Sequence, residues 1–239
     1  MRKMNARKTL VKKHYDIATR ADAVHDNAPC ALDSIHERNS SKFKHFTAQE
    51  IIYREGDRIS NLHIIRNGIV KLVRYLPNGR ARIIRLHNRN QWLGYEGIIG
   101  SPYEHTAIAV GDVETNYIPI NSLKNLEKSD PELYREFLKH VYQHLIQADK
   151  WIADFSTGGI KPRVARLLLY LSDIEYGESS NMIDLLTVHE LADVLGVTQE
   201  SVSRILADLK RRNTLQKTSD SNDETYKMNQ QQLLYEAGR

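Results

Sequence analysis

The hydrophobic positions of this chain follow a β-type pattern and then a helical one. Residues 1–40 are largely polar and show no sustained period, so they are predicted to form an extension. After them, short apolar runs recur between turn-forming residues. The runs predicted to be strands are 51–54, 62–65, 69–76, 81–86, 106–110 and 113–118. Short strands separated by regular turns indicate a small antiparallel β-roll, which we assign to residues 41–126.

Two turn sequences mark connections within this roll. Asn67-Gly68 lies between apolar runs, and both residues tolerate a positive φ, so a β-hairpin is predicted at this point. Pro77-Asn78-Gly79 marks a further turn between two predicted strands, because proline and glycine favour the backbone angles of tight turns.

A long amphipathic helix is predicted over residues 127–156. Asp130 is placed to cap it, Pro131 suits its first turn, and Glu132 favours the positive end of the helix dipole. Apolar residues recur every three or four positions and form one stripe, made of Leu133, Phe137, Val141, Leu145, Ala148, Ile152 and Phe155. Because the helix is longer than a small roll can cover, we expect it to pack on the roll and against the same helix of a second subunit.

The sequence Thr157-Gly158-Gly159 breaks the long helix and is the expected hinge to a C-terminal unit, residues 157–239. A second helix is predicted over 161–174. Near the end of the chain, 214–217 and 226–228 are predicted to form a two-stranded wing, because turn-forming residues separate them.

Between these elements lies a helix-turn-helix pattern. Thr187 and Glu190 have the spacing of a capping box, and Gly196 suits the left-handed turn that ends a helix. Thr198 is predicted to cap a second helix, whose buried face consists of Val202, Ile205, Leu206 and Leu209. Two short helices joined by a glycine-containing turn are typical of a DNA-binding helix-turn-helix.

The start of the second helix carries the candidate DNA contacts. The residues predicted to contact base edges are Gln199, Glu200, Ser203 and Arg204. Arg204 can pair bidentately with guanine, Glu200 can accept from a cytosine amino group, and Ser203 can serve either type of base. The residues predicted to contact the DNA backbone are Thr198, Lys210, Arg211, Arg212 and Lys217.

Composition limits the alternatives. The formal net charge is +4 and the sequence pI about 9.0, which permits nucleic acid as a partner. Residues 157–239 nevertheless hold 10 Lys or Arg against 12 Asp or Glu, so binding would depend on a local basic cluster. Cys30 is the one cysteine, which excludes an intrachain disulfide and fits a cytoplasmic location. No apolar run is long enough for a membrane span, and the basic residues 1–8 are interpreted as a solvated arm.

From about residue 45 the chain resembles the Crp/Fnr family of bacterial transcription regulators. Gly56-Asp57, Asn67-Gly68 and Gly79 stand where that family's β-roll has its turns. Residues 161–168 resemble the helix after its dimerisation helix, and Glu200-Ser201-Val202-Ser203-Arg204 matches the Glu-x-x-Ser-Arg signature of the Fnr branch. The resemblance implies an α+β protein with a β-roll like that of cyclic nucleotide-binding domains, a long dimerisation helix and a C-terminal winged helix-turn-helix.

The same resemblance implies a homodimer that regulates transcription from TTGAT-type inverted repeats, with Arg204, Ser203 and Glu200 on the bases and RNA polymerase as a further partner. An effector at the roll would act through a pocket that includes Gly94, Tyr95, Glu96, His105 and Thr106. The effector itself stays open.

Two cofactors of the family are not expected. An iron–sulfur cluster needs four cysteines, and Asn116 stands at the internal cysteine position. Cyclic AMP needs a Gly-Glu pair and an Arg followed by Ser or Thr, whereas Gly94 is followed by Tyr95 and His105-Thr106 replaces the arginine pair. On the long helix, Ala148-Asp149 replaces the Thr-Ser that meets the base, so we expect no tight binding of cyclic AMP.

Several other patterns were weighed. His189-Glu190 starts an HExxH-like sequence, but Asp193 stands in place of the second histidine, so a zinc protease is excluded. His140 and His144 are interpreted as surface histidines rather than metal ligands, and Cys30 as an incidental thiol. Trp92, Tyr95 and Tyr103 either line an effector pocket or pack in the core. No pattern supports an enzyme. The alternative function is a ligand-binding or scaffold module whose C-terminal unit binds protein.

Overall fold

A computed structural model describes residues 42–124, 126–177, 180–184, 186–218 and 225–238. The predicted extension, Cys30 and the turn of the wing at 219–223 lie outside the described residues. Within the described ranges, every helix is too short or too polar to pass through a bilayer.

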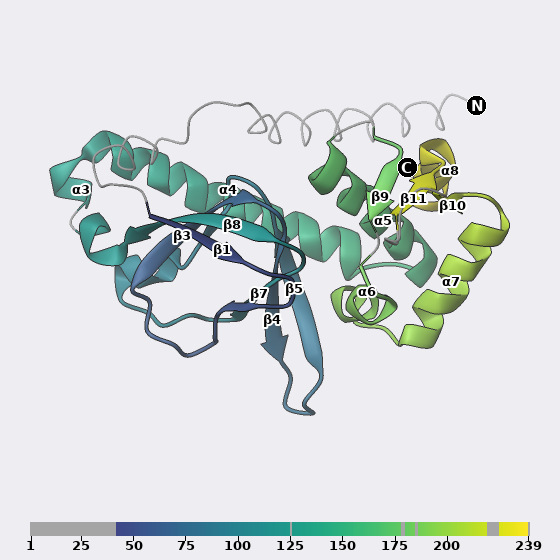
Figure 1. The fold of residues 1–239 in the computed structure, drawn as a ribbon, viewed down its shortest axis with the longest axis horizontal. Helices are drawn as coiled ribbons and strands as arrows, with labels where there is room; N and C mark the ends of the chain where they lie inside the picture. Colours follow the sequence, from purple (N-terminus) through teal and green to yellow (C-terminus); the bar gives the residue numbers. More distant parts are fainter. Residues whose placement is uncertain (1–41, 125, 178–179, 185, 219–224, 239) are drawn as a thin grey trace, which may run out of the picture. The chain divides into compact units, whose positions relative to one another are not determined.

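The first half of the described chain forms two four-stranded antiparallel sheets (Figure 1). Their strand orders are β1-β8-β3-β6 and β2-β7-β4-β5. The strands are β1 (Lys42–Phe46), β2 (Ile51–Tyr53), β3 (Asn61–Asn67), β4 (Val70–Tyr75), β5 (Ala81–His87), β6 (Trp92–Leu93), β7 (Thr106–Ala109) and β8 (Val113–Pro119). The roll expected from the sequence is confirmed. The prediction missed β1 and β6, because β1 buries only Phe46 and β6 has two residues.

The predicted hairpin at Asn67-Gly68 is wrong. Strand β3 pairs with β6 and β8, whereas β4 pairs with β5 and β7, so the chain crosses from one sheet to the other at this point. The glycine is required for another reason: its φ is 85°, and a Cβ there would overlap the backbone oxygen of Asp112. The turn around Asn78 does join the antiparallel pair β4 and β5.

One short helical turn, η2 (Tyr95–Ile99), lies within the roll between β6 and β7. Two more, η3 (Ile120–Leu123) and α3 (Leu126–Ser129), lead from the roll to the long helix α4 (Pro131–Phe155). The predicted cap is confirmed, since the Leu133 amide donates to Asp130 Oδ1 at 3.1 Å. The predicted stripe divides between two environments: Leu133, Phe137 and Phe155 are buried, whereas Leu145 and Ile152 are exposed.

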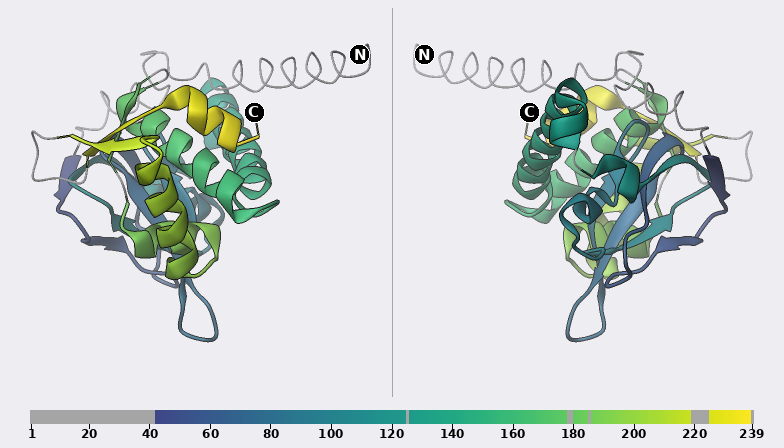
Figure 2. Two further views of the ribbon diagram at one scale, coloured as in Figure 1. Left: turned by 90° about the vertical axis from the view of Figure 1, so that its right-hand side faces the viewer. Right: turned by 90° about the vertical axis from the view of Figure 1, so that its left-hand side faces the viewer.

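The C-terminal part contains a winged helix-turn-helix. Its elements are α5 (Ile160–Tyr176), β9 (Met182–Asp184), α6 (Val188–Leu195), α7 (Gln199–Arg211), β10 (Leu215–Lys217), β11 (Thr225–Met228) and α8 (Gln230–Glu236). The wing is a sheet of order β10-β11-β9, so β9 adds a third strand that the sequence analysis did not predict. Helix α8 at the end of the chain was not predicted either. Figures 1 and 2 show α7 on the side of α6 that faces away from the β-roll.

A single arginine of α5 joins two helix ends. Arg163 Nε donates to the backbone oxygen of Phe155 at the end of α4 at 2.7 Å. Its Nη2 donates to the backbone oxygen of Leu195 at the end of α6. Because the last carbonyls of a helix lack partners within it, the guanidinium satisfies both ends at once.

Candidate nucleic-acid interface

Local capping sets the geometry of the helix-turn-helix. Thr187 Oγ1 accepts from the Glu190 amide at 3.2 Å, and Glu190 Oε2 accepts from the Thr187 amide at 3.0 Å, which is the predicted capping box. Gly196 ends α6 with a φ of 62°, as predicted. Thr198 then caps α7 by accepting from the Ser201 amide. These contacts fix the angle at which α7 leaves the turn.

The start of α7 presents polar side chains to solvent. Gln199, Glu200, Ser203 and Arg204 are all exposed. The opposite face, formed by Val202, Leu206 and Leu209, is buried, so the helix cannot turn its polar face inwards without exposing this apolar one. The structure thus brings the four predicted base-contacting residues to one exposed face.

Glu200 is set up as a hydrogen-bond acceptor. Backbone N–H groups at the start of α7, and then the Thr198 side chain, lower the pKa of the Glu200 carboxyl. Negative charge is favoured at the start of a helix, where backbone N–H groups are free. Glu200 is therefore ionised at neutral pH and suited to accept from an amino group.

The predicted backbone-contacting cations already have partners. Arg211 and Arg212 bind Asp208 with N–O distances of 2.5 and 2.9 Å, and Arg212 also reaches Glu236 at 3.2 Å. Lys210 Nζ donates to the hydroxyl of Tyr226 at 2.8 Å. The side chains of Arg211 and Arg212 are 78% and 51% exposed, so a phosphate can still reach them. Lys217 on β10 and Thr198 at the start of α7 are also exposed.

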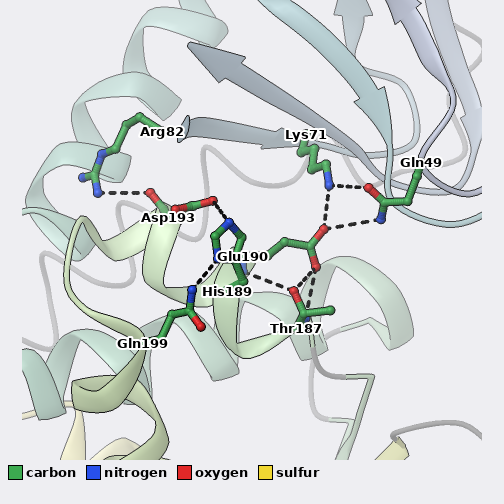
Figure 3. A network of polar contacts seen from close by, with 8 residues as sticks. All are labelled: Gln49, Lys71, Arg82, Thr187, His189, Glu190, Asp193 and Gln199. Carbon is green, nitrogen blue, oxygen red and sulfur yellow. Dashed lines mark hydrogen bonds and ion pairs between the residues drawn. The ribbon is translucent and has the colours of Figure 1, made fainter. Parts of the chain in front are cut away.

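The sequence interpretation missed one neighbour of Gln199. His189 was placed on the helix surface, and its side chain is indeed 64% exposed. Its Nδ1 nevertheless lies 2.5 Å from Gln199 Nε2, and its Nε2 lies 3.3 Å from Asp193 Oδ2 (Figure 3). The spacing of His189 and Asp193, four positions apart on a helix, could have indicated their contact, but the contact to Gln199 depends on the turn.

A buried ion pair joins the helix-turn-helix to the roll. Lys71 Nζ on β4 lies 2.6 Å from Glu190 Oε1 and 2.7 Å from Gln49 Oε1 (Figure 3). Both charged side chains are about nine-tenths buried. Burial alone would raise the pKa of Glu190, but the hydrogen bonds from Lys71 and Thr187 outweigh it and lower that pKa. Glu190 was predicted only as a cap; it also anchors α6 to β4.

The predicted effector residues lie together around η2 and β7. Gly94 precedes η2 with a φ of 83°. Glu96 Oε1 lies 3.9 Å from His105 Nδ1, and burial raises the pKa of Glu96. Thr106 is buried and its hydroxyl accepts from the Glu55 amide at 3.1 Å. The ring of Tyr95 lies 5.3 Å from that of His144 on α4, so the cluster reaches the long helix.

The interpretation of His144 as a surface histidine is wrong, and His140 is only partly exposed. His144 is 5% exposed, and its ring stacks on that of the buried His87 at 5.3 Å. His140 stacks on Trp92 at 3.8 Å. Burial, followed by His140 and Arg85, lowers the pKa of His144 to about 3. In the described part of the chain, no three His, Cys, Asp or Glu side chains are arranged to hold a metal ion.

Aromatic residues near this cluster serve mainly as packing. Trp92 is 2% exposed, and the buried Tyr103 stacks on Tyr53 with 3.6 Å between ring centroids. Arg85, which the sequence did not single out, lies in the same region: its Nη1 donates to the backbone oxygen of His144 at 3.4 Å. Burial, and then Arg85, lower the pKa of His105, so this cation also lies near His105.

The outer side of α4 carries an apolar face that no described part of the chain covers. The exposed large side chains on this helix are Leu138, Tyr142, Leu145 and Ile152. They follow one another at intervals of 4, 3 and 7 positions, which is the spacing of a coiled-coil seam. This face suits a second helix of the same kind.

Comparison with known proteins gives consistent results. Residues 43–130 match the cyclic nucleotide-binding domain, and residues 162–230 match the Crp-like helix-turn-helix domain. The transcriptional regulator LdrP of Thermus thermophilus is 28% identical over 170 residues, which cover 70% of this chain and 84% of that protein. The CRP-like cAMP-activated global transcriptional regulator of Mycobacterium tuberculosis is 25% identical over 171 residues, 70% of this chain and 76% of its own.

Solved structures show the same fold. A transcriptional regulator of the CRP family from Thermus thermophilus has a TM-score of 0.70 at 25% identity, over 82% of this chain and 97% of its own. FixK2 from Bradyrhizobium japonicum has a TM-score of 0.70 at 23% identity, over 82% of this chain and 96% of its own. The named relatives are transcription regulators rather than enzymes.

Proposed function

The chain belongs to the Crp/Fnr family of transcription regulators, and we propose on that premise that it binds double-stranded DNA as a homodimer at TTGAT-like inverted repeats. One observation carries the proposal: Glu200, Ser203 and Arg204 lie together on the exposed face at the start of α7. In a helix-turn-helix this part of the second helix meets base edges in the major groove. Gln199 completes the base-contacting set, and Thr198, Lys210, Arg211, Arg212 and Lys217 contact phosphates.

The homodimer is proposed from the exposed face of α4. Leu138, Tyr142, Leu145 and Ile152 would be covered by the same residues of a second copy. A symmetric pair of α4 helices would place two recognition helices about a twofold axis, which matches an inverted repeat.

An effector is proposed to act at the cluster around Tyr95, Glu96 and His105. The cluster touches α4 through His144, and the same roll holds α6 through Lys71 and Glu190. A ligand that moved the roll would therefore act on both the dimer helix and the helix-turn-helix. Neither cyclic AMP nor an iron–sulfur cluster is the proposed ligand, because the site lacks the paired arginine and the cysteines. RNA polymerase is the proposed further partner, and the cytoplasm the proposed location.

Substitution of Arg204 tests the proposal. Arg204→Ala is expected to abolish the preference for a TTGAT palindrome over a scrambled duplex and to weaken binding by about 1–3 kcal/mol per half-site. The measurement is a titration of both duplexes by gel shift or fluorescence anisotropy. The matched control is Arg58→Ala, an exposed arginine of the roll that should leave both affinities unchanged. An unchanged preference in the Arg204 variant would refute the proposed contact.

A further inference from the structure

A chain of three side chains links α6 to the first residue of α7. Asp193, His189 and Gln199 follow one another through the 3.3 Å and 2.5 Å contacts (Figure 3). The Asp193 side chain is 10% exposed, whereas Gln199 and His189 face solvent. Arg82 Nη1 donates to the backbone oxygen of Asp193 at 3.1 Å, which places a cation beside this residue. The chain therefore starts at a largely buried carboxylate and ends at a proposed base-contacting amide.

The carboxylate decides which imidazole nitrogen carries the proton. An ionised carboxylate only accepts hydrogen bonds, so the Asp193 oxygen 3.3 Å from His189 Nε2 favours a proton on that nitrogen. A neutral imidazole then has a bare Nδ1, which can only accept. Gln199 must meet it with the N–H side of its amide, and its carbonyl oxygen points away from His189, as Figure 3 shows.

This arrangement leaves one edge of the amide available. One N–H of Gln199 binds His189, while the carbonyl oxygen and the second N–H remain free. An amide that offers an acceptor beside a donor pairs with adenine, accepting from N6 and donating to N7. Without His189, an exposed glutamine can turn its amide over at little cost and offer either group first.

We propose that His189 is a positioning residue that makes Gln199 select adenine in the base pair facing the start of α7. The inference rests on the proposed DNA-binding function and adds one specificity contact to it. His189 acts through Gln199 and need not touch the base.

The test measures base preference rather than total affinity. Full-length protein is titrated with duplexes in which each half-site position is changed symmetrically to all four bases, at constant salt. The unmodified protein should favour adenine at one position by about tenfold. Gln199→Ala and His189→Leu should each remove that preference, and the double variant should remove no more. The guanine preference assigned to Arg204 should survive in all three.

Other outcomes overturn the inference. If His189→Leu loses the same affinity on every duplex, His189 makes a phosphate or structural contact instead. If His189→Leu keeps the adenine preference, Gln199 needs no partner to select adenine. His45→Leu, at an exposed histidine of β1, is the control and should change nothing. If the unmodified protein binds no DNA, the proposed function fails as well; if it binds and only the Gln199 position is indifferent, the inference alone fails.

Discussion

His144 should make stability depend on pH. Its buried surroundings lower its pKa from 6.5 to about 3, so the unfolded chain takes up a proton below pH 6.5 that the folded chain refuses. Folding stability is therefore lost as pH falls from 6.5 towards 3, by about 1.4 kcal/mol per pH unit for one such group. His144→Leu should reduce this slope by up to about 1.4 kcal/mol per pH unit in urea titrations between pH 6.5 and 5, while the lowered pKa values of the buried His63 and His87 leave a residual slope. A slope in the His144→Leu protein equal to that of the unmodified protein would contradict the assignment.

Lys71 and Glu190 should behave as a buried pair. Lys71→Met leaves the Glu190 carboxylate buried without its cation and should lower the free energy of unfolding by about 3 kcal/mol. The double variant Lys71→Met/Glu190→Gln should recover most of this loss, because glutamine keeps the capping geometry without a charge. Urea denaturation gives the free energy of unfolding of the unmodified protein, the single variant and the double variant.

The matched control for Lys71 lies on the same strand. Arg74 on β4 pairs with Glu55 at 3.5 Å, and both side chains are more than one-third exposed. Arg74→Met should therefore cost about 1 kcal/mol or less. Equal losses in the Lys71 and Arg74 variants would mean that the first pair is not buried in solution.

These residues also show which contacts a sequence pattern can predict and which it cannot. Thr187, Glu190 and Gly196 were predicted from spacing alone, because capping is a contact between residues three positions apart. The partners Lys71 and His87 were not, because each lies more than fifty positions from the residue it meets. A polar residue such as His144 on an amphipathic helix is expected to face solvent, and its burial is recognised only once the position of β5 with His87 is known.

Helix α4 should depend on its outer face for pairing. Leu145 is 60% exposed and lies in the middle of the coiled-coil spacing, so Leu145→Asp would place two carboxylates in the proposed seam. We expect this variant to be monomeric in sedimentation velocity and to lose binding to the palindrome, while its circular dichroism stays unchanged.

The comparison for Leu145 is Glu136→Lys on the same helix. The Glu136 side chain is 43% exposed, and its position two residues before Leu138 places it on the side of α4 away from the proposed seam. This variant should remain dimeric, since it changes charge without entering the interface. A dimeric Leu145→Asp protein would contradict the proposed seam.

Among the elements, helices were predicted better than connections. The limits of α4 follow from Asp130 at its start and the glycines after it, all local signals. Strand pairing is not local: Asn67-Gly68 has the composition of a hairpin, yet its strands belong to different sheets because β8 and β7 come from later in the chain. Likewise, β9 is recognised only through its partner β11.

The molecule as a whole should bind DNA in a salt-dependent way. A dimer offers two copies of Lys210, Arg211, Arg212 and Lys217, so the slope of log K against log salt should approach about −7 if all contact phosphates. Lys217→Ala should reduce the steepness by about 2, because each copy removes one contact. Anisotropy titrations from low to high salt give both slopes. Affinity that did not change with salt would favour the alternative of a protein-binding scaffold.

The hydrophobic core does not stop at the expected boundary between the two halves. Val73, Ile83 and Leu86 of the roll belong to the same buried cluster as Leu191 and Leu195 of α6. Sequence pattern could assign residues to a roll and a helix-turn-helix, but it could not show that the apolar side chains of both complete one core. The limits 41–126, 127–156 and 157–239 therefore remain a prediction.

Arg163 has a mechanical consequence. The segment after α4 contains two glycines and would by itself be flexible. The Arg163 guanidinium, however, is hydrogen-bonded to the last turns of both α4 and α6. We therefore expect this guanidinium to couple a rotation of α4 to the helix-turn-helix, so that the two glycines do not act as a free hinge.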